Sequence, residues 1–152
     1  MIKLTEDGSF QFEGLKVYQK SLEFVDLIYG LTAKFPKSEQ FNLVDQFRRA
    51  AISICLNIAE GSGCSKTEFA RFLRISRRSV RECVAITEIA CRQKLIDDDR
   101  RRNIRKSCEE LSRMLNGLMK SLGPKAEAEQ GPYFCFHTPN SEPRTPNSHR
   151  RC

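Results

Sequence analysis

Side chains able to perform nucleophilic or acid–base chemistry are sparse in this 152-residue sequence. Its two histidines, His137 and His149, lie near the C-terminus, outside the part that we expect to fold. The best-placed pair of carboxylates is Glu60 with Glu68, but a helix end and an N-terminal capping box explain these positions without catalysis. Gly61-Ser62-Gly63 follows no predicted strand, so we interpret it as a turn and not as a nucleotide-binding loop. We therefore predict no catalytic residue, no cofactor and a protein that is not an enzyme.

The seven cysteines also lack the spacing of a reactive or metal-binding site. Their number is odd and no C-x-x-C pair occurs among them, which argues against a zinc knuckle. We predict no metal site and mostly buried, reduced thiols, as is usual in a cytosolic protein. They are Cys55, Cys64, Cys83, Cys91, Cys108, Cys135 and Cys152.

Arginines in the second half of the chain are the strongest candidates for binding chemistry. Arg71, Arg74, Arg78 and Arg81, here called the arginine row, step by 3, 4 and 3 residues and so lie along one helical edge, with Arg77 beside them. Arginine binds phosphate in forked geometry, whereas a solvated outer face is the simpler alternative. Phe72 falls on the apolar side of this helix and no aromatic residue shares the edge with the arginines, so we expect phosphate contact without base stacking, to RNA or DNA. The predicted fourth helix extends this basic surface through Arg101, Arg102, Arg105 and Lys106.

The charge of the chain is unevenly distributed. The sequence carries 26 Lys and Arg against 19 Asp and Glu, for a net charge of +7. Residues 13–64 hold 6 basic and 6 acidic residues, while residues 65–123 hold 15 basic and 8 acidic residues. A localised positive surface suits a polyanion or an acidic protein face.

The segment Gln46–Gly61 is the predicted central helix, because its apolar residues occur on more than one side. Polar residues are threaded through it, and buried polar groups must be paired. We predict that they form a structural network that joins helices or subunits; a polar binding site is the alternative. These residues are Gln46, Arg49, Ser53, Asn57 and Glu60.

Four helices should position these residues. We expect them at Glu13–Phe35, from Ser38 to Gly61, from a capping box at Ser65-Lys66-Thr67-Glu68 onward, and at Asp98–Leu122. Gly61 is predicted to end the second helix in a left-handed turn.

Spare apolar surface on two of these helices predicts a homo-oligomer. The first helix carries two apolar seams, and one of them can meet another subunit; alternatively, the two seams form one broad stripe on a well-buried helix. The third helix has an isoleucine flank between its apolar and basic sides, which we predict to be a subunit contact. The seams are Leu15, Tyr18, Leu22, Val25 and Tyr29, and Val17, Phe24, Ile28, Leu31 and Phe35; the flank is Ile75, Ile86 and Ile89.

These patterns define an all-α protein, an antiparallel up-down four-helix bundle with a disordered C-terminal tail. We expect an N-terminal arm at residues 1–12, the bundle at 13–123 and a flexible polar tail at 124–152, with one docking point at Tyr133–Phe136. No apolar run reaches the length of a membrane span and no signal peptide is evident, so we expect a cytoplasmic protein with no membrane partner.

Several motifs in register resemble a known family. The sequence is similar to the bacterial four-helix-bundle family named after proteins encoded in 23S ribosomal RNA intervening sequences, over roughly residues 12–95. Where that family usually has Ala-Arg-Gly-Ser in the third helix, this chain has Ser76-Arg77-Arg78-Ser79. The motifs are Leu15-Lys16-Val17-Tyr18, Phe35-Pro36, Gln46-Phe47-Arg48-Arg49-Ala50, Ser53, Asn57-Ile58-Ala59-Glu60-Gly61 and Phe72-Leu73.

The resemblance implies a ring of five subunits. Some relatives of this architecture are accessory variability determinants of diversity-generating retroelements, which bind nucleic acid and associate with a reverse transcriptase. We therefore hypothesise a non-enzymatic, oligomeric scaffold that binds nucleic acid through a basic face, with a reverse transcriptase as an implied partner. The alternative hypothesis is a protein-interaction module whose basic face recruits an acidic partner protein.

Overall fold

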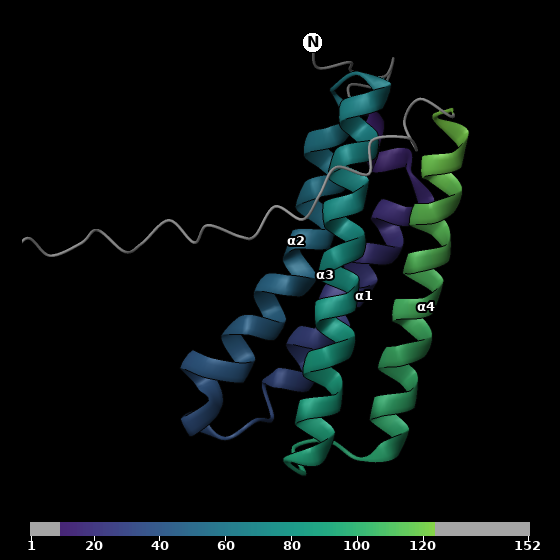
Figure 1. The fold of residues 1–152 in the computed structure, drawn as a ribbon. Helices are drawn as coiled ribbons and strands as arrows, with labels where there is room; N and C mark the ends of the chain where they lie inside the picture. The colour runs from purple at the N-terminus through teal and green to yellow at the C-terminus, as the bar shows by residue number, and fades with distance from the viewer. Residues whose placement is uncertain (1–9, 124–152) are drawn as a thin grey trace, which may run out of the picture.

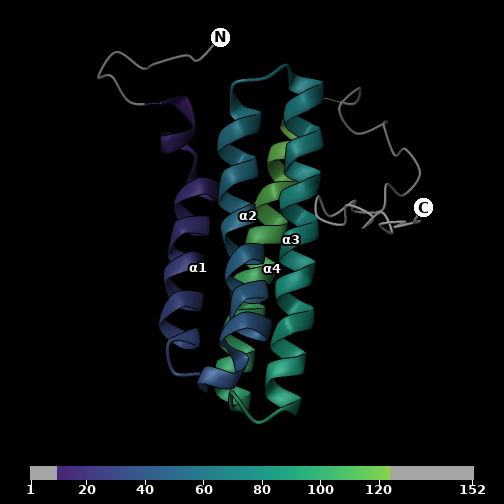
Figure 2. The same ribbon diagram turned by 90° about the vertical axis from the view of Figure 1, so that its left-hand side faces the viewer.

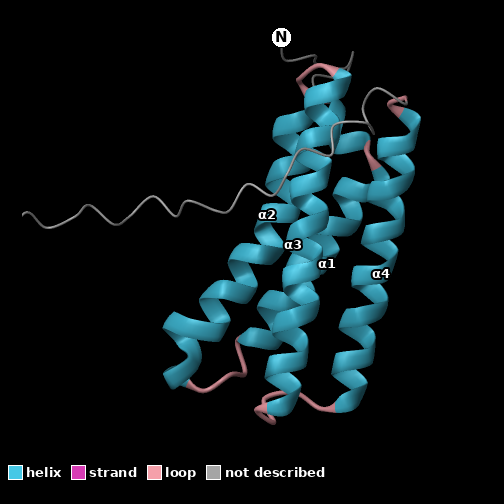
Figure 3. Ribbon diagram, in the orientation of Figure 1, coloured by secondary structure: helices cyan, strands magenta, loops and turns pink. Residues whose placement is uncertain are grey.

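The computed structural model describes residues 10–123, which form an antiparallel bundle of four α-helices (Figure 1). Helix follows helix up and down the bundle, and no strand occurs within residues 10–123 (Figure 3). The predicted all-α four-helix bundle is thus confirmed, whereas the predicted disordered tail lies outside the described residues. The helices are α1 (Lys16–Thr32), α2 (Asp45–Ser62), α3 (Lys66–Arg92) and α4 (Asp98–Ser121).

The first two helices are shorter than predicted, because their ends adopt other helical forms. A 3-10 helix, η1 (Gln11–Gly14), precedes α1, and Leu15 between them is extended. A second 3-10 turn, η2 (Lys37–Glu39), and a π-helical turn, η3 (Gln40–Val44), lead into α2. The segment that we expected to begin helix two is therefore helical, but it is not yet α-helix.

The turn between α2 and α3 corrects the role predicted for Gly61. This residue lies inside α2, which ends at Ser62, and Gly123 is the single glycine with positive φ among residues 10–123. A Cβ atom added to Gly61 would lie 2.6 Å from Cβ of Phe72 and 2.7 Å from Cδ2 of Phe69. Gly61 is thus required for the close approach of α3 to the end of α2, and not for a left-handed turn.

The core is continuous through the bundle and draws on all four helices. Figure 2 shows α1, α2 and α3 running alongside one another, with α4 behind them. In α1 the second predicted seam faces inward, as the burial of Val17, Phe24 and Ile28 shows. In α2 the prediction of apolar contact on several sides holds only in part, since Leu56 is 54% exposed. Helix α4 contributes Ile104, Cys108, Leu111 and Leu115, which are all buried. No helix within residues 10–123 is long and apolar enough to cross a membrane.

Candidate nucleic-acid interface

Helix α3 positions the arginine row, and its start is fixed by the predicted capping box. The Ser65 hydroxyl accepts from the backbone N–H of Glu68, and the Glu68 carboxylate accepts in return from the backbone N–H of Ser65. These reciprocal bonds satisfy two amide groups that the first turn would leave unpaired. The Ser65 hydroxyl also donates to Oε2 of Glu68 at 2.8 Å, and this bond is the main cause that lowers the pKa of Glu68.

The arginine row lies on the side of α3 that faces away from the core. Arg71, Arg78 and Arg81 are exposed and Arg74 is half-buried, while Leu73 and Val80 of the same turns are buried in the bundle. The row covers about 15 Å of helix. Arg78, which takes the place of the glycine usual in the family, is exposed and thus adds positive charge without disturbing the core.

Arg77 shows that positive charge is concentrated at this point. Its Nη1 donates a hydrogen bond to Oδ1 of Asn116 in α4 at 2.9 Å, so the guanidinium bridges the two helices. The pKa of Arg77 is lowered, first by burial and then by repulsion from Arg81, Arg74 and Arg78. Because these arginines repel one another, an anion that binds between them would be stabilised at this surface.

The basic residues predicted to extend the surface on α4 lie farther along the bundle, and most of them are neutralised. Arg101 and Arg105 form ion pairs with Glu88 of α3 at 3.3 and 2.8 Å, and Arg102 pairs with Asp99. Glu88 is seven residues beyond Arg81, or about 10 Å along the helix. Lys106 is exposed. The structure therefore does not bring this cluster together with the arginine row.

Two other basic residues of α4 flank the row, and the sequence analysis missed them. Asn116, which contacts Arg77, lies on one helical line with Arg113 and Lys120, three residues before and four residues after it. Both side chains are exposed. The antiparallel pairing of α3 with α4 decides which part of α4 meets the row, and spacing within one helix contains no information on that pairing.

The predicted polar network of α2 is divided into separate contacts. Nδ2 of Asn57 donates to the carbonyl and the hydroxyl of Ser53, and the Ser79 hydroxyl of α3 donates to Oγ of Ser53 at 2.9 Å. Arg49 instead pairs with Asp45 at 2.9 Å and its side chain is 74% exposed. The prediction that Arg49 lies in a buried network is wrong for the single chain.

The two ends of the predicted network are exposed as well. Gln46 hydrogen-bonds to Glu82 at the surface, and Glu60 is exposed. The buried polar contact between α2 and α3 is made by Ser76, whose hydroxyl donates to the Ile54 carbonyl at 3.0 Å. This bond was not predicted from the sequence.

An apolar surface remains on the outside of α1 and α2, and we call it the outer stripe. The Arg48 guanidinium lies 4.5 Å from the centre of the Tyr29 ring, which brings a line of α2 side chains next to the first predicted seam of α1. Leu22, Tyr29 and Leu56 are each more than a third exposed. The outer stripe consists of Leu22, Val25 and Tyr29 of α1 and Arg48, Ile52 and Leu56 of α2.

The isoleucine flank predicted on α3 is only partly available for contact. Ile86 is 4% exposed and belongs to the core of its own bundle, whereas Ile89 is 47% exposed. The prediction that Ile86 is a subunit contact is therefore wrong. Turning α3 by a few tens of degrees relative to the expected orientation is enough to bury it, which residue spacing alone does not determine.

Fold and surface together define a four-helix bundle with one basic outer face on α3. The profile of the 23S rRNA-intervening sequence protein family matches residues 13–117. The chain belongs to this family, which confirms the resemblance found in its motifs.

A solved structure has a similar fold. It is the crystal structure of a protein with unknown function from the S23 ribosomal protein family of Bacteroides thetaiotaomicron VPI-5482. The two chains are 26% identical, with a TM-score of 0.64, and the similarity covers 68% of this chain and 95% of the other. No curated protein sequence matches this chain.

Proposed function

We propose that this protein is a non-enzymatic, cytoplasmic, oligomeric scaffold that binds the phosphate backbone of RNA or DNA through α3. The contact surface consists of the arginine row, Arg77 beside it, and Arg113 and Lys120 of α4. The observation that carries the proposal is the difference between two sets of arginines. Within residues 10–123, Arg71, Arg78 and Arg81 form no ion pair, whereas Arg101, Arg102 and Arg105 do.

Arg71, Arg78 and Arg81 suit phosphate contact, because no ion pair with a carboxylate of residues 10–123 has to be broken before a phosphate binds. Each contact with a phosphate releases counterions, and this electrostatic term supplies most of the affinity of a protein that does not recognise bases. The absence of an aromatic side chain within the arginine row favours backbone contact over stacking. We expect binding with little sequence preference.

Assembly would strengthen this binding. We propose a homopentameric ring, as the family resemblance implies, with the outer stripe as a subunit contact. A ring repeats the arginine row once in each subunit, so that weak single contacts add through avidity. A reverse transcriptase is a further partner that the resemblance implies.

The experiment compares two variants that each lose four positive charges. The row variant carries Arg71→Gln, Arg74→Gln, Arg78→Gln and Arg81→Gln. The control variant carries Lys34→Gln, Lys37→Gln, Arg92→Gln and Lys94→Gln, all exposed and located at the opposite end of the bundle (Figure 1). Glutamine keeps a long polar side chain and good helix propensity. Binding of labelled duplex RNA, duplex DNA and single strands is measured by anisotropy at fixed salt concentration.

We expect the row variant to lose affinity by about a hundredfold or more, because four phosphate contacts are removed. The control variant has the same net charge as the row variant but keeps the arginine row, so it should lose much less affinity. Circular dichroism and light scattering must show that both variants still fold and assemble. Equal affinities of the two variants would refute the proposed surface, and retained binding of an acidic protein would then favour the protein-interaction alternative.

A further inference from the structure

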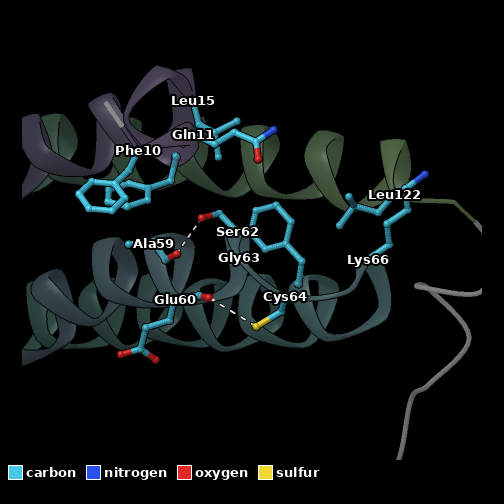
Figure 4. A pocket seen from close by; sticks show the side chains of 12 residues that line it. Phe10, Gln11, Leu15, Ala59, Glu60, Ser62, Gly63, Cys64, Lys66 and Leu122 are labelled. Carbon is cyan, nitrogen blue, oxygen red and sulfur yellow. Dashed lines mark hydrogen bonds between the residues drawn. The ribbon is translucent and has the colours of Figure 1, made fainter. Parts of the chain in front are cut away.

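A pocket of about 590 Å³ opens at the end of the bundle where η1, the α2–α3 turn and the end of α4 meet (Figure 4). One wall holds Phe10 and Phe12, whose rings stack with centroids 5.7 Å apart. Phe69 of α3 and Leu122 at the end of α4 also line it. Phe10 is 40% exposed. Residues 10–123 thus leave a concave surface open to solvent, with the rings of Phe10, Phe12 and Phe69 among its lining side chains.

Polar groups lie at the rim of this pocket. Glu60, Cys64 and Lys66 come from the end of α2 and the start of α3 (Figure 4). Cys64 is exposed, and its thiol is directed to the Glu60 carbonyl oxygen at 3.5 Å. A concave apolar surface with a few polar groups at its edge is typical of binding sites. Aromatic side chains are the usual anchors in such pockets.

The C-terminal segment of the same chain fits this description of an occupant. Residues 124–152 contain three aromatic residues, all within Tyr133-Phe134-Cys135-Phe136. The segment starts after Gly123, next to Leu122, which lines the pocket. Tyr133 is ten positions beyond Gly123, and ten steps of extended chain span about 33–36 Å, enough to return to the pocket.

The N-terminal residues are a weaker candidate for the same place. Residues 1–9 directly precede Phe10 in the sequence, and Phe10 lines the pocket, but they contain no aromatic residue. Their large apolar side chains are Met1, Ile2 and Leu4. An aromatic wall is matched better by Tyr133, Phe134 and Phe136, since aromatic pairs gain from edge-to-face and offset contacts.

We propose that Tyr133–Phe136 docks in the pocket of its own chain. Docking covers Phe10 and Phe69 and brings Cys135 next to Cys64 at the rim. It also fixes the first turns of α3, one turn before Arg71, and so links the C-terminal segment to the end of the helix that carries the arginine row. This inference does not depend on nucleic-acid binding.

The two native thiols provide the test. Brief treatment of the full chain with diamide, which accepts two electrons and two protons, joins neighbouring thiols as a disulfide. Peptide mass spectrometry then identifies the pairs. We expect a Cys64–Cys135 link within one chain to form faster than a Cys64–Cys152 link. The substitutions Tyr133→Ser, Phe134→Ser and Phe136→Ser together should slow it by about tenfold or more, because Cys135 then meets Cys64 only through undirected encounters within the chain.

A matched control changes the same segment outside the aromatic residues. Asn140→Ser with Asn147→Ser should leave the rate of the Cys64–Cys135 link unchanged. Equal rates of linkage to Cys135 and Cys152, insensitive to the aromatic substitutions, would overturn the proposal. A Cys64–Cys135 link found only between two chains would overturn docking within one chain and assign the pocket to a second copy.

A second measurement does not depend on thiols. The chain contains no tryptophan, so Phe134→Trp introduces a single reporter. Its fluorescence should be blue-shifted relative to that of Asn147→Trp, because a docked indole is shielded from water. The shift should disappear when Tyr133 and Phe136 are both replaced by Ser. Identical, fully solvated spectra of the two tryptophan variants would contradict docking.

Discussion

At the scale of single residues, Gly61 and Arg78 show opposite consequences of side-chain size. Gly61 lies against Phe69 and Phe72, with no room for a Cβ atom. At position 78, where the family usually has glycine, a long side chain is accommodated because the position faces solvent. A glycine is therefore required where another helix packs against the position, as at residue 61, and is dispensable where the position faces solvent, as at residue 78.

Gly61→Ala should lower the free energy of unfolding by about 1–3 kcal/mol, because the added methyl group forces the rings of α3 or the backbone to move. Gly117→Ala is a matched control, since Gly117 lies within α4 and a methyl group there would have no neighbouring side chain within 4 Å. It should raise stability by about 0.5–1 kcal/mol. Urea unfolding of both variants measures the two changes. Equal stability of Gly61→Ala and the parent would contradict the close contact.

Arg49 and Ser76 show where residue-level prediction from the sequence fails. Arg49 was predicted to lie in a buried network, but within the single chain its side chain is 74% exposed and pairs with Asp45. Ser76 is buried in α3, and its bond to the Ile54 carbonyl could not be foreseen from the sequence. Side-chain partners across two helices depend on register and rotation, and neither is encoded in the pattern of one helix.

Helices α3 and α4 are joined by ion pairs of Glu88 near the turn between them, and by the hydrogen bond from Arg77 to Asn116 farther along α3. Glu88 receives hydrogen bonds from Arg101 and Arg105, with Nη1 of Arg105 at 2.8 Å. These contacts lower the pKa of Glu88, chiefly through the hydrogen bond from Arg105. The ion pairs of Glu88 thus contribute to the contact between α3 and α4 in a pH-dependent way.

Glu88→Gln should reduce stability at pH 7 and have no effect in strong acid. Because the pKa of Glu88 is lower in the folded chain than in the unfolded chain, its contribution is present above the unfolded value of about 4.3. It is lost as pH falls through the folded value, when both states bind the proton. Urea unfolding at pH 7 and at about pH 2 measures the difference.

The arginine partners provide the control for this prediction. In a background with Arg101→Gln and Arg105→Gln, replacing Glu88 should no longer change the pH dependence. A difference between the parent and Glu88→Gln that is the same at both pH values would show that Glu88 acts through packing and not through charge.

The elements themselves were largely predictable. Periodicity and the capping box gave the four helices, and α3 begins with the expected reciprocal bonds. The π-helical turn Gln40–Val44 was not predicted, because its sequence differs little from that of an ordinary first turn. The two flanking residues Arg113 and Lys120 were missed because they depend on how α4 pairs with α3.

At the scale of the whole molecule, the outer stripe and the arginine row lie on different helices. The outer stripe runs along α1 and α2, and the arginine row runs along α3. The proposed assembly through the outer stripe would therefore leave the arginine row accessible in every subunit. A monomer with several half-exposed large apolar residues in one stripe would be unusual.

Leu22→Glu combined with Leu56→Glu should dissociate the assembly, because two charges would have to be buried without partners. Light scattering with size-exclusion chromatography measures the mass, which should fall to that of one chain. Ile89→Glu is the comparison, since Ile89 is exposed on α3. If Ile89→Glu dissociates the assembly and the double variant does not, the contact lies on the isoleucine flank instead.

The salt dependence of nucleic-acid binding reports directly on phosphate contact by the arginine row. The dissociation constant for duplex RNA or DNA is measured from low to moderate salt for the parent, the row variant and the control variant. If each arginine of the row neutralises one phosphate per bound site, the log–log slope of the row variant should be flatter than that of the parent by about three to four. The control variant should keep the slope of the parent. Identical slopes for the parent and the row variant, both being folded and assembled, would contradict phosphate binding through α3.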